Sequence, residues 1–199
     1  MDIIKKLNES KTIYDVPMDN IPIRGFCLGI TSGNAMISKI IKYYSSKFEK
    51  IQKEFLASHA FVMFDRTVFE STMFGNQERH ISKYIKNGHE FWLFHPLDVL
   101  EKDYDKALSY AQGALGRMYD YPGFLRFFFK FMPQLKYADF CSEFASNVIE
   151  YLKVPFIKLE AEDISPARML RYCILNDNQW QMIAHYKNGK LINDQDSVN

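Results

Sequence analysis

The chain has only three cysteines, Cys27, Cys141 and Cys173, among its 199 residues. Their odd number and irregular spacing argue against a secreted domain held together by disulfides and indicate a reducing compartment. No stretch approaches the roughly 20 apolar residues that a membrane-spanning helix needs. Residues 1–11 are polar and contain no signal-peptide core, so the sequence predicts a cytoplasmic protein.

The sequence also lacks an excess of charge and any arrangement typical of a metal or phosphate site. Its formal net charge of +1 gives no overall attraction to nucleic acid or acidic membranes, although local patches remain open. His80, His89, His95 and His185 show no metal-ligand spacing, and we interpret them as structural. Residues 113–116 lack the strand and the Gly-Lys-Ser/Thr ending of a phosphate loop. We expect no metal, no cofactor and no nucleic-acid partner.

Aromatic side chains, in contrast, are abundant, with 17 Phe and 12 Tyr. The length is sufficient for one domain with a full core. Helical and strand-like segments alternate, which predicts an α+β domain with helices packed against a mostly antiparallel sheet. We expect an N-terminal arm over residues 1–20 and a single domain over residues 21–199. Residues 35–44 are predicted to form a helix whose apolar face contains Met36, Ile37, Ile40, Ile41 and Tyr44.

Residues 138–152 are predicted to form a helix with a cysteine in its first turn and Asp139 as the N-cap. Helical spacing predicts one buried stripe made of Cys141, Ala145, Val148, Ile149 and Leu152. The free N–H groups and the positive dipole at a helix start favour a thiolate, so Cys141 is a candidate nucleophile. A free cysteine often only packs in a core, and this stretch alone favours that simpler interpretation.

A candidate base for this cysteine lies in a predicted β-hairpin. Residues 58–64 and 67–71 are strand-like, and Asp65-Arg66 can turn the chain between them. A two-residue turn pairs Phe64 with Thr67, which makes His59 and Glu70 diagonal neighbours on one face of the sheet. Taken alone, a histidine at a strand start is usually structural and a glutamate is usually solvated. The register nevertheless allows the side chains of His59 and Glu70 to meet.

Five short stretches stand in an unusual order: Thr31-Ser32-Gly33, Ser58-His59, Glu70, Gly116-Arg117-Met118-Tyr119-Asp120-Tyr121 and Phe140-Cys141-Ser142-Glu143. In this order they resemble the circularly permuted branch of the NlpC/P60 papain-like superfamily, which includes the YiiX-like proteins. The resemblance covers residues 22–172 and implies a permuted papain-like fold. It further implies that Cys141 is the nucleophile, His59 the base, Glu70 the group that orients the base, and Tyr119 the tyrosine near the oxyanion site.

The chain also departs from the family pattern in three places. Phe26-Cys27 stand where Gly-Asp is common, Met118 stands where proline is common, and residues 45–56 form a longer segment than usual. The first two differences concern local structure more than chemistry, whereas the third is able to reshape a substrate cleft.

The resemblance implies a cysteine hydrolase, a peptidase or amidase, that cleaves a peptide or a cell-wall-type amide through a thioacyl intermediate. Two alternatives stay open: a thiol-dependent acyltransferase or lipid hydrolase, and a binding protein that keeps the fold without turnover. The sequence names neither the substrate nor the oligomeric state.

The aromatic stretch at residues 124–132, from Phe124 to Met132, allows two interpretations. We favour an amphipathic helix that packs in the core. The alternative is a hydrophobic flap beside the nucleophile that accepts an acyl chain or touches a membrane. Arg126 and Lys130 are four residues apart and suit both interpretations.

Overall fold

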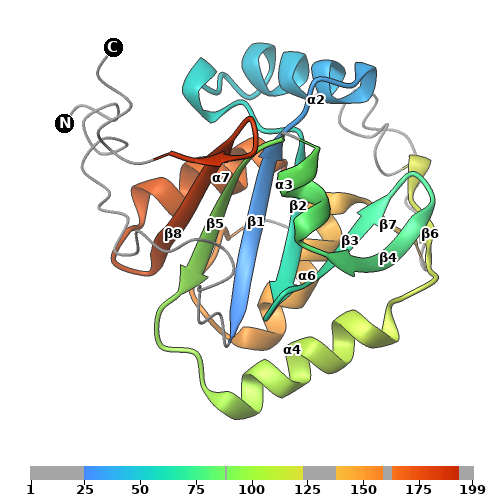
Figure 1. Ribbon diagram of the computed structural model, residues 1–199, viewed down its shortest axis with the longest axis vertical. Helices are drawn as coiled ribbons and strands as arrows, with labels where there is room; N and C mark the ends of the chain where they lie inside the picture. The colour runs from blue at the N-terminus through green and yellow to red at the C-terminus, as the bar shows by residue number, and fades with distance from the viewer. Residues whose placement is uncertain (1–24, 88, 123–137, 159–162, 193–199) are drawn as a thin grey trace.

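The computed structural model describes residues 25–87, 89–122, 138–158 and 163–192. Its centre is a seven-stranded sheet in the order β4-β3-β2-β1-β5-β8-β9, in which every neighbouring pair is antiparallel (Figure 1). The strands are β1 Phe26–Ser32, β2 His59–Phe64, β3 Thr67–Thr72, β4 Gly75–His80, β5 Glu90–Pro96, β8 Trp180–Lys187 and β9 Lys190–Leu191. A separate parallel pair joins β6 Met118–Tyr119 to β7 Ala138–Asp139.

Helices cover both faces of the sheet. α6 and α7 lie on one face and α3 on the other, while α4 runs alongside α6 and α2 crosses one end of the sheet (Figure 1). Their bounds are α2 Met36–Lys47, α3 Ser82–Lys86, α4 Glu101–Gly113, α6 Cys141–Leu152 and α7 Pro166–Leu175, with a 3-10 turn at Lys53–Phe55. The described residues thus form an α+β fold with a mostly antiparallel sheet, which confirms that part of the prediction.

The two faces of the sheet belong to two separate hydrophobic clusters. Phe26, Leu28 and Ile30 of β1 pack toward α6 and α7, whereas Cys27 between them belongs to the cluster on the α3 side. This alternation follows from the two-residue period of a strand. Gly29 continues the α3 side, and a Cβ placed there would lie 2.0 Å from the ring of Phe61. The missing side chain therefore provides the space that the Phe61 ring fills.

Several predicted details differ from the structure. In α2 only Ile41 of the predicted apolar face is buried, while Met36 and Ile40 are exposed. Residues 75–80 form a further strand, β4, for which the sequence gave no apolar signal because every residue after Gly75 is polar. The proposed arm at residues 1–20 and the aromatic stretch at residues 124–132 lie outside the described residues, so both interpretations remain predictions.

Candidate active site

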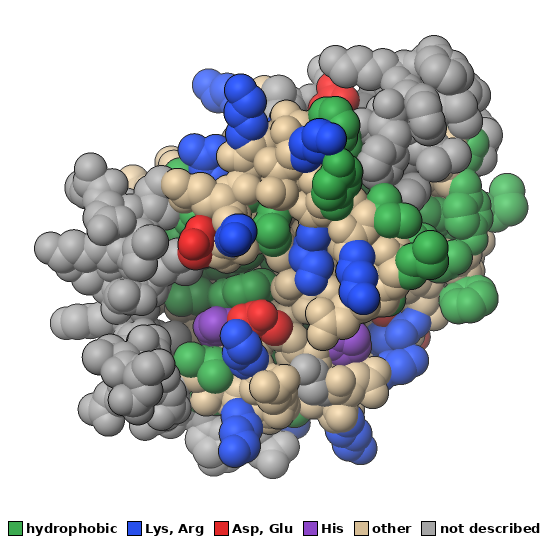
Figure 2. Space-filling model, turned by 90° about the horizontal axis from the view of Figure 1, so that it is seen from above, with side chains coloured by type: hydrophobic (Ala, Val, Ile, Leu, Met, Phe, Trp, Pro, Cys, Tyr) green, Lys and Arg blue, Asp and Glu red, His purple; other side chains and the backbone are tan. Residues whose placement is uncertain are grey.

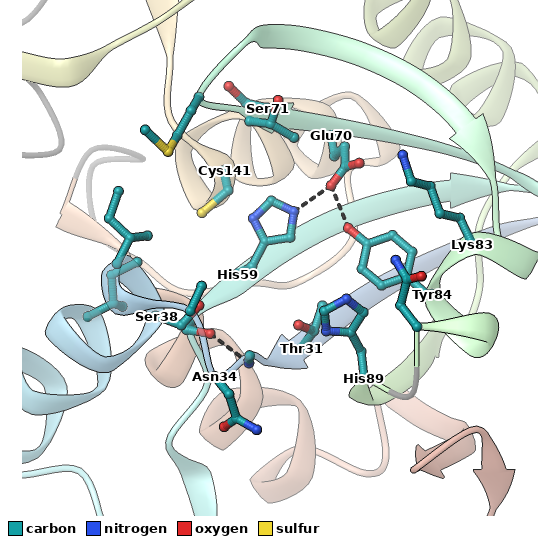
Figure 3. A pocket seen from close by; sticks show the side chains of 18 of the residues that line it. Thr31, Asn34, Ser38, His59, Glu70, Ser71, Lys83, Tyr84, His89 and Cys141 are labelled. Carbon is teal, nitrogen blue, oxygen red and sulfur yellow. Dashed lines mark hydrogen bonds and ion pairs between the residues drawn. The ribbon is translucent and has the colours of Figure 1, made fainter.

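A pocket of about 250 Å³ lies at the end of the sheet beneath α2 (Figure 3). Cys141, His59, Glu70 and Tyr119 all contribute to its lining. These residues come from α6, β2, β3 and β6, four elements that are distant in the sequence. The structure thus brings together all four residues that the sequence singled out.

The β2–β3 hairpin positions His59 beside Glu70, as the sequence predicted. Phe64 pairs with Thr67 across the two-residue turn, and the register continues to Val62 opposite Phe69. Nε2 of His59 lies 2.6 Å from Oε2 of Glu70. Because Nε2 is bound to this carboxylate, Nδ1 is the nitrogen left for the sulfur, and Figure 3 shows that edge of the ring facing Cys141.

The Glu70 carboxylate is held by two further side chains that the sequence did not reveal. Tyr84 of α3 donates its hydroxyl to Oε2 at 2.5 Å, and Nε of Arg79 in β4 lies 2.6 Å from Oε1. The side chain of Glu70 is only 2% exposed. Its burial raises the carboxyl pKa, but hydrogen bonds from His59 and Tyr84 and the charges of His59 and Arg79 lower it overall. Glu70 is therefore a fixed, ionised partner for the imidazole.

The same contacts favour the protonated form of His59. Burial opposes the charge on the ring, but the charge and hydrogen bond of Cys141, together with those of Glu70, raise the imidazole pKa to about 10. These contacts thus favour a charged imidazolium ring beside the sulfur. His89, whose spacing in the sequence favours a structural role, also lines the pocket, and burial and the positive charge of His59 lower its pKa.

Cys141 is the first residue of α6, although the helix is capped differently from the prediction. Phe140, not Asp139, stands at the N-cap, and the backbone N–H of Phe140 donates to Oε2 of Glu143 at 3.3 Å. The first bond of the helical ladder is donated by the N–H of Phe144 to the carbonyl of Phe140. The N–H of Cys141 precedes that ladder and is one of the groups that a helix start leaves for other partners.

Asp139 instead anchors the start of α6 to the sheet. Its carboxylate accepts hydrogen bonds from Nδ2 of Asn76 at 2.9 Å and Nδ2 of Asn147 at 3.4 Å. Its backbone carbonyl accepts a bond from Oγ of Ser71 at 2.6 Å. Ser71 follows Glu70 in β3, so the strand that carries the orienting carboxylate also fixes the residues just before the nucleophile.

Tyr119 lies on the wall of the pocket in the short strand β6. The neighbouring strand β4 holds β6 in place, since the N–H of Asn76 donates to the carbonyl of Arg117 at 2.9 Å. Gly75 permits this approach, because it has a φ of +94° and a Cβ there would lie 2.4 Å from the Arg117 oxygen. Burial and the nearby charge of Cys141 raise the pKa of Tyr119. The phenol therefore stays protonated and is able to donate a hydrogen bond.

Neither a protein-family model nor a curated protein matches this sequence. Within the described ranges no group of three His, Cys, Asp or Glu side chains is placed to hold a metal ion. No helix in the same part of the chain is long and apolar enough to cross a membrane. A function for this pocket therefore has to be inferred from its geometry.

The three cysteines are expected to differ sharply in reactivity. All are free and buried, but only Cys141 lines the pocket. Burial, with a smaller contribution from the charge of Asp65, raises the pKa of Cys27 to about 12, and burial raises that of Cys173 as well. Iodoacetamide near neutral pH, followed by peptide mass spectrometry, should modify Cys141 well before the other two. Equal labelling rates at all three positions would show that Cys141 is not more reactive than the other two thiols.

Proposed function

We propose that this protein is a cysteine hydrolase of the permuted papain-like type, a peptidase or amidase that cleaves an amide bond. The observation that carries the proposal is the relay in which Glu70 binds Nε2 of His59 while Nδ1 faces the sulfur of Cys141. A nucleophile, a base that contacts it and a carboxylate that orients the base are the minimal set of groups for acyl transfer through a thioester. The proposed fold type rests on the resemblance described above together with this convergence of its site residues.

In the proposed reaction the proton of the Cys141 thiol resides on Nδ1 of His59. The sulfur attacks the carbonyl carbon of the substrate and forms a C–S bond, and the carbonyl oxygen takes up the displaced electron pair. When that oxygen re-forms its double bond, the C–N bond breaks and Nδ1–H of His59 protonates the leaving amine. Water, deprotonated by the now neutral His59, then attacks the thioester and releases the acid and the Cys141 thiol.

Two donors near the sulfur are suited to hold the transient oxyanion. One is the backbone N–H of Cys141, which precedes the hydrogen-bond ladder of α6. The other is the hydroxyl of Tyr119 on the same pocket wall. Donors fixed in advance at such a position are often the largest single contribution to catalysis.

The proposal is tested by incubating the protein with a library of internally quenched peptides and, in parallel, with acyl esters. We expect amide cleavage by the wild type and none by Cys141→Ala. Activity on esters but on no amide would favour the lipid or acyl hydrolase alternative. No turnover in either library, combined with an unreactive Cys141, would favour a binding protein.

Replacing Tyr119 with phenylalanine tests its part in the reaction. The variant keeps the ring and removes only the hydroxyl, so the fold and the labelling of Cys141 should change little. Losing one oxyanion donor costs about 2.7–4 kcal/mol, which sets the upper limit for the expected loss of turnover, roughly 10²–10³-fold. The measurement is the turnover rate on any substrate that Cys141→Ala does not process. An unchanged rate would remove Tyr119 from the mechanism.

A further inference from the structure

Helix α2 carries apolar side chains on its outer face as well as on the face that lines the pocket. Ile41 is buried, whereas Met36, Ile40 and Tyr43 are exposed, Met36 by 81% of its surface. Successive spacings of four and three residues place these three in one stripe along the helix. Phe48, directly after the helix, is also exposed. The outer side of α2 is thus unusually apolar for a surface helix.

A second apolar projection stands at the turn between β3 and β4. Phe74 at its tip is 96% exposed, and Met73 beside it is exposed as well. The hydroxyl of Tyr121 donates to the carbonyl of Met73 at 2.7 Å, which brings Tyr121 and the nearby Met118 to the same projection. Eight of the twelve large hydrophobic side chains exposed in the described residues belong to α2, Phe48 or this projection. Apolar exposure is therefore concentrated on one part of the surface.

The pocket lies between these two apolar elements. Ile37 and Ile41 of α2 line it from one side, and Met73 of the β3–β4 turn lines it from the other. Cys141 lies in the same pocket and is 5% exposed. Whatever covers the apolar surface therefore also meets the entrance to the reactive sulfur.

The same surface is basic. The sequence from α2 to the 3-10 turn carries five lysines, Lys39, Lys42, Lys47, Lys50 and Lys53. Of the two acidic residues in this segment, Glu49 is buried in an ion pair with Arg168 at 2.7 Å, and Glu54 is exposed beside Lys53. Figure 2 shows basic and hydrophobic side chains side by side on this face. The segment therefore carries five lysines against one exposed acidic side chain, Glu54.

We propose that this face, comprising the outer stripe of α2, its lysines and the tip of the β3–β4 turn, docks on an anionic lipid surface. A helix with exposed apolar residues and flanking lysines is typical of segments that lie in the headgroup region, with the lysine stems extended toward the phosphates. Phe74 and Met36 enter the bilayer interface on either side of the pocket. In combination with the proposed hydrolase activity, which it does not require, this docking presents the site to substrates held at a membrane.

The test uses the full chain with Cys141→Ala, so that binding is measured without turnover. It is sedimented with vesicles of phosphatidylcholine alone or of phosphatidylcholine and phosphatidylglycerol in equal parts. We expect binding to the anionic vesicles only, weakened by added salt. Phe74→Ser and Ile40→Glu should each weaken it by about tenfold, because each removes an apolar group from the interface. Lys39→Glu should weaken it as well.

Matched controls lie on the opposite side of the molecule. Leu100, at the start of α4, is 57% exposed, so Leu100→Ser removes a similar exposed apolar group, and Lys102→Glu reverses an exposed charge in α4. Both controls should bind like the parent. Equal binding to both vesicle types, or loss of binding that is the same in the control variants, would overturn the proposal. It would also be overturned if Phe74→Ser and Ile40→Glu instead turned a dimer into a monomer, since the face would then be a protein interface.

Discussion

Glu70→Gln is expected to lower turnover by as much as about 10⁴-fold, the effect of replacing the orienting carboxylate of a Ser–His–Asp triad by its amide. The carboxylate binds Nε2 of His59 at 2.6 Å and contributes to the raised imidazole pKa of about 10. In the wild type, amide cleavage should therefore decline only as the pH rises toward 10, where His59 loses the proton needed by the leaving amine. In Glu70→Gln this decline should begin at lower pH, because the stabilising charge is gone. The measurement is the pH profile of turnover for both proteins.

Glu78→Gln is the matched control for this variant. Glu78 lies on the neighbouring strand β4 and is exposed, so the same chemical change there should leave both the rate and the pH profile unaltered. Circular dichroism has to show first that Glu70→Gln is folded, because Arg79 loses its ion-pair partner in this variant. A folded Glu70→Gln with wild-type turnover would show that Glu70 does not orient the base.

Gly29→Ala is expected to destabilise the protein by about 1–3 kcal/mol, the range for adding a methyl group to a packed core. A Cβ at position 29 would lie 2.0 Å from two ring atoms of Phe61, which is fully buried. The ring has little space to move, since its centroid lies 4.6 Å from that of Tyr84. For a chain of this length the melting temperature should fall by about 2–12 °C.

The same substitution at Gly113 provides the contrast. Gly113 ends α4, and a Cβ there meets nothing within 4 Å. Alanine lowers the conformational entropy of the unfolded chain, so Gly113→Ala should be neutral or more stable by up to about 1 kcal/mol. If thermal unfolding shows the two variants to be equally stable, then the close packing of Phe61 on β1 does not contribute to the stability of the sheet.

The local features of the site were predictable because neighbouring residues determine them. The turn at Asp65-Arg66 sets the hairpin register, and the register alone placed His59 next to Glu70. The helical spacing after Cys141 identified the buried side of α6 in the same way. That the hairpin and the helix meet was implied only by the family resemblance, since no local pattern encodes a contact between segments so far apart.

The features that were missed depend on tertiary contacts. Arg79 stands in β4, whose uniformly polar sequence does not resemble a buried strand, and Tyr84 belongs to a helix of five residues. The contact between Arg79 and Glu70 could have been predicted only from the register of β3 with β4. In that register Glu70 pairs with Gln77, which makes Arg79 a diagonal neighbour of Glu70. Asp139 has a residue type that is common at the N-cap, yet its carboxylate accepts hydrogen bonds from Asn76 and Asn147 instead.

The outward stripe of α2 was missed for a related reason. Hydrophobic periodicity shows that apolar residues share a face, but it does not show which faces the rest of the chain covers. Ile41 packs inward while Met36 and Ile40 face outward. The permuted papain-like assignment itself remains a prediction that rests on the resemblance and on the convergence at the pocket.

The most direct test of the Cys141–His59 pair is the rate of Cys141 alkylation by iodoacetate relative to iodoacetamide at neutral pH. We expect the anionic reagent to be favoured in the folded wild type, because the charged His59 ring lies beside the sulfur. The preference should disappear in His59→Gln and in the wild type unfolded by guanidinium. A ratio that is the same in all three samples would contradict the proposed Cys141–His59 pair, since it would mean that no imidazolium lies next to the nucleophile.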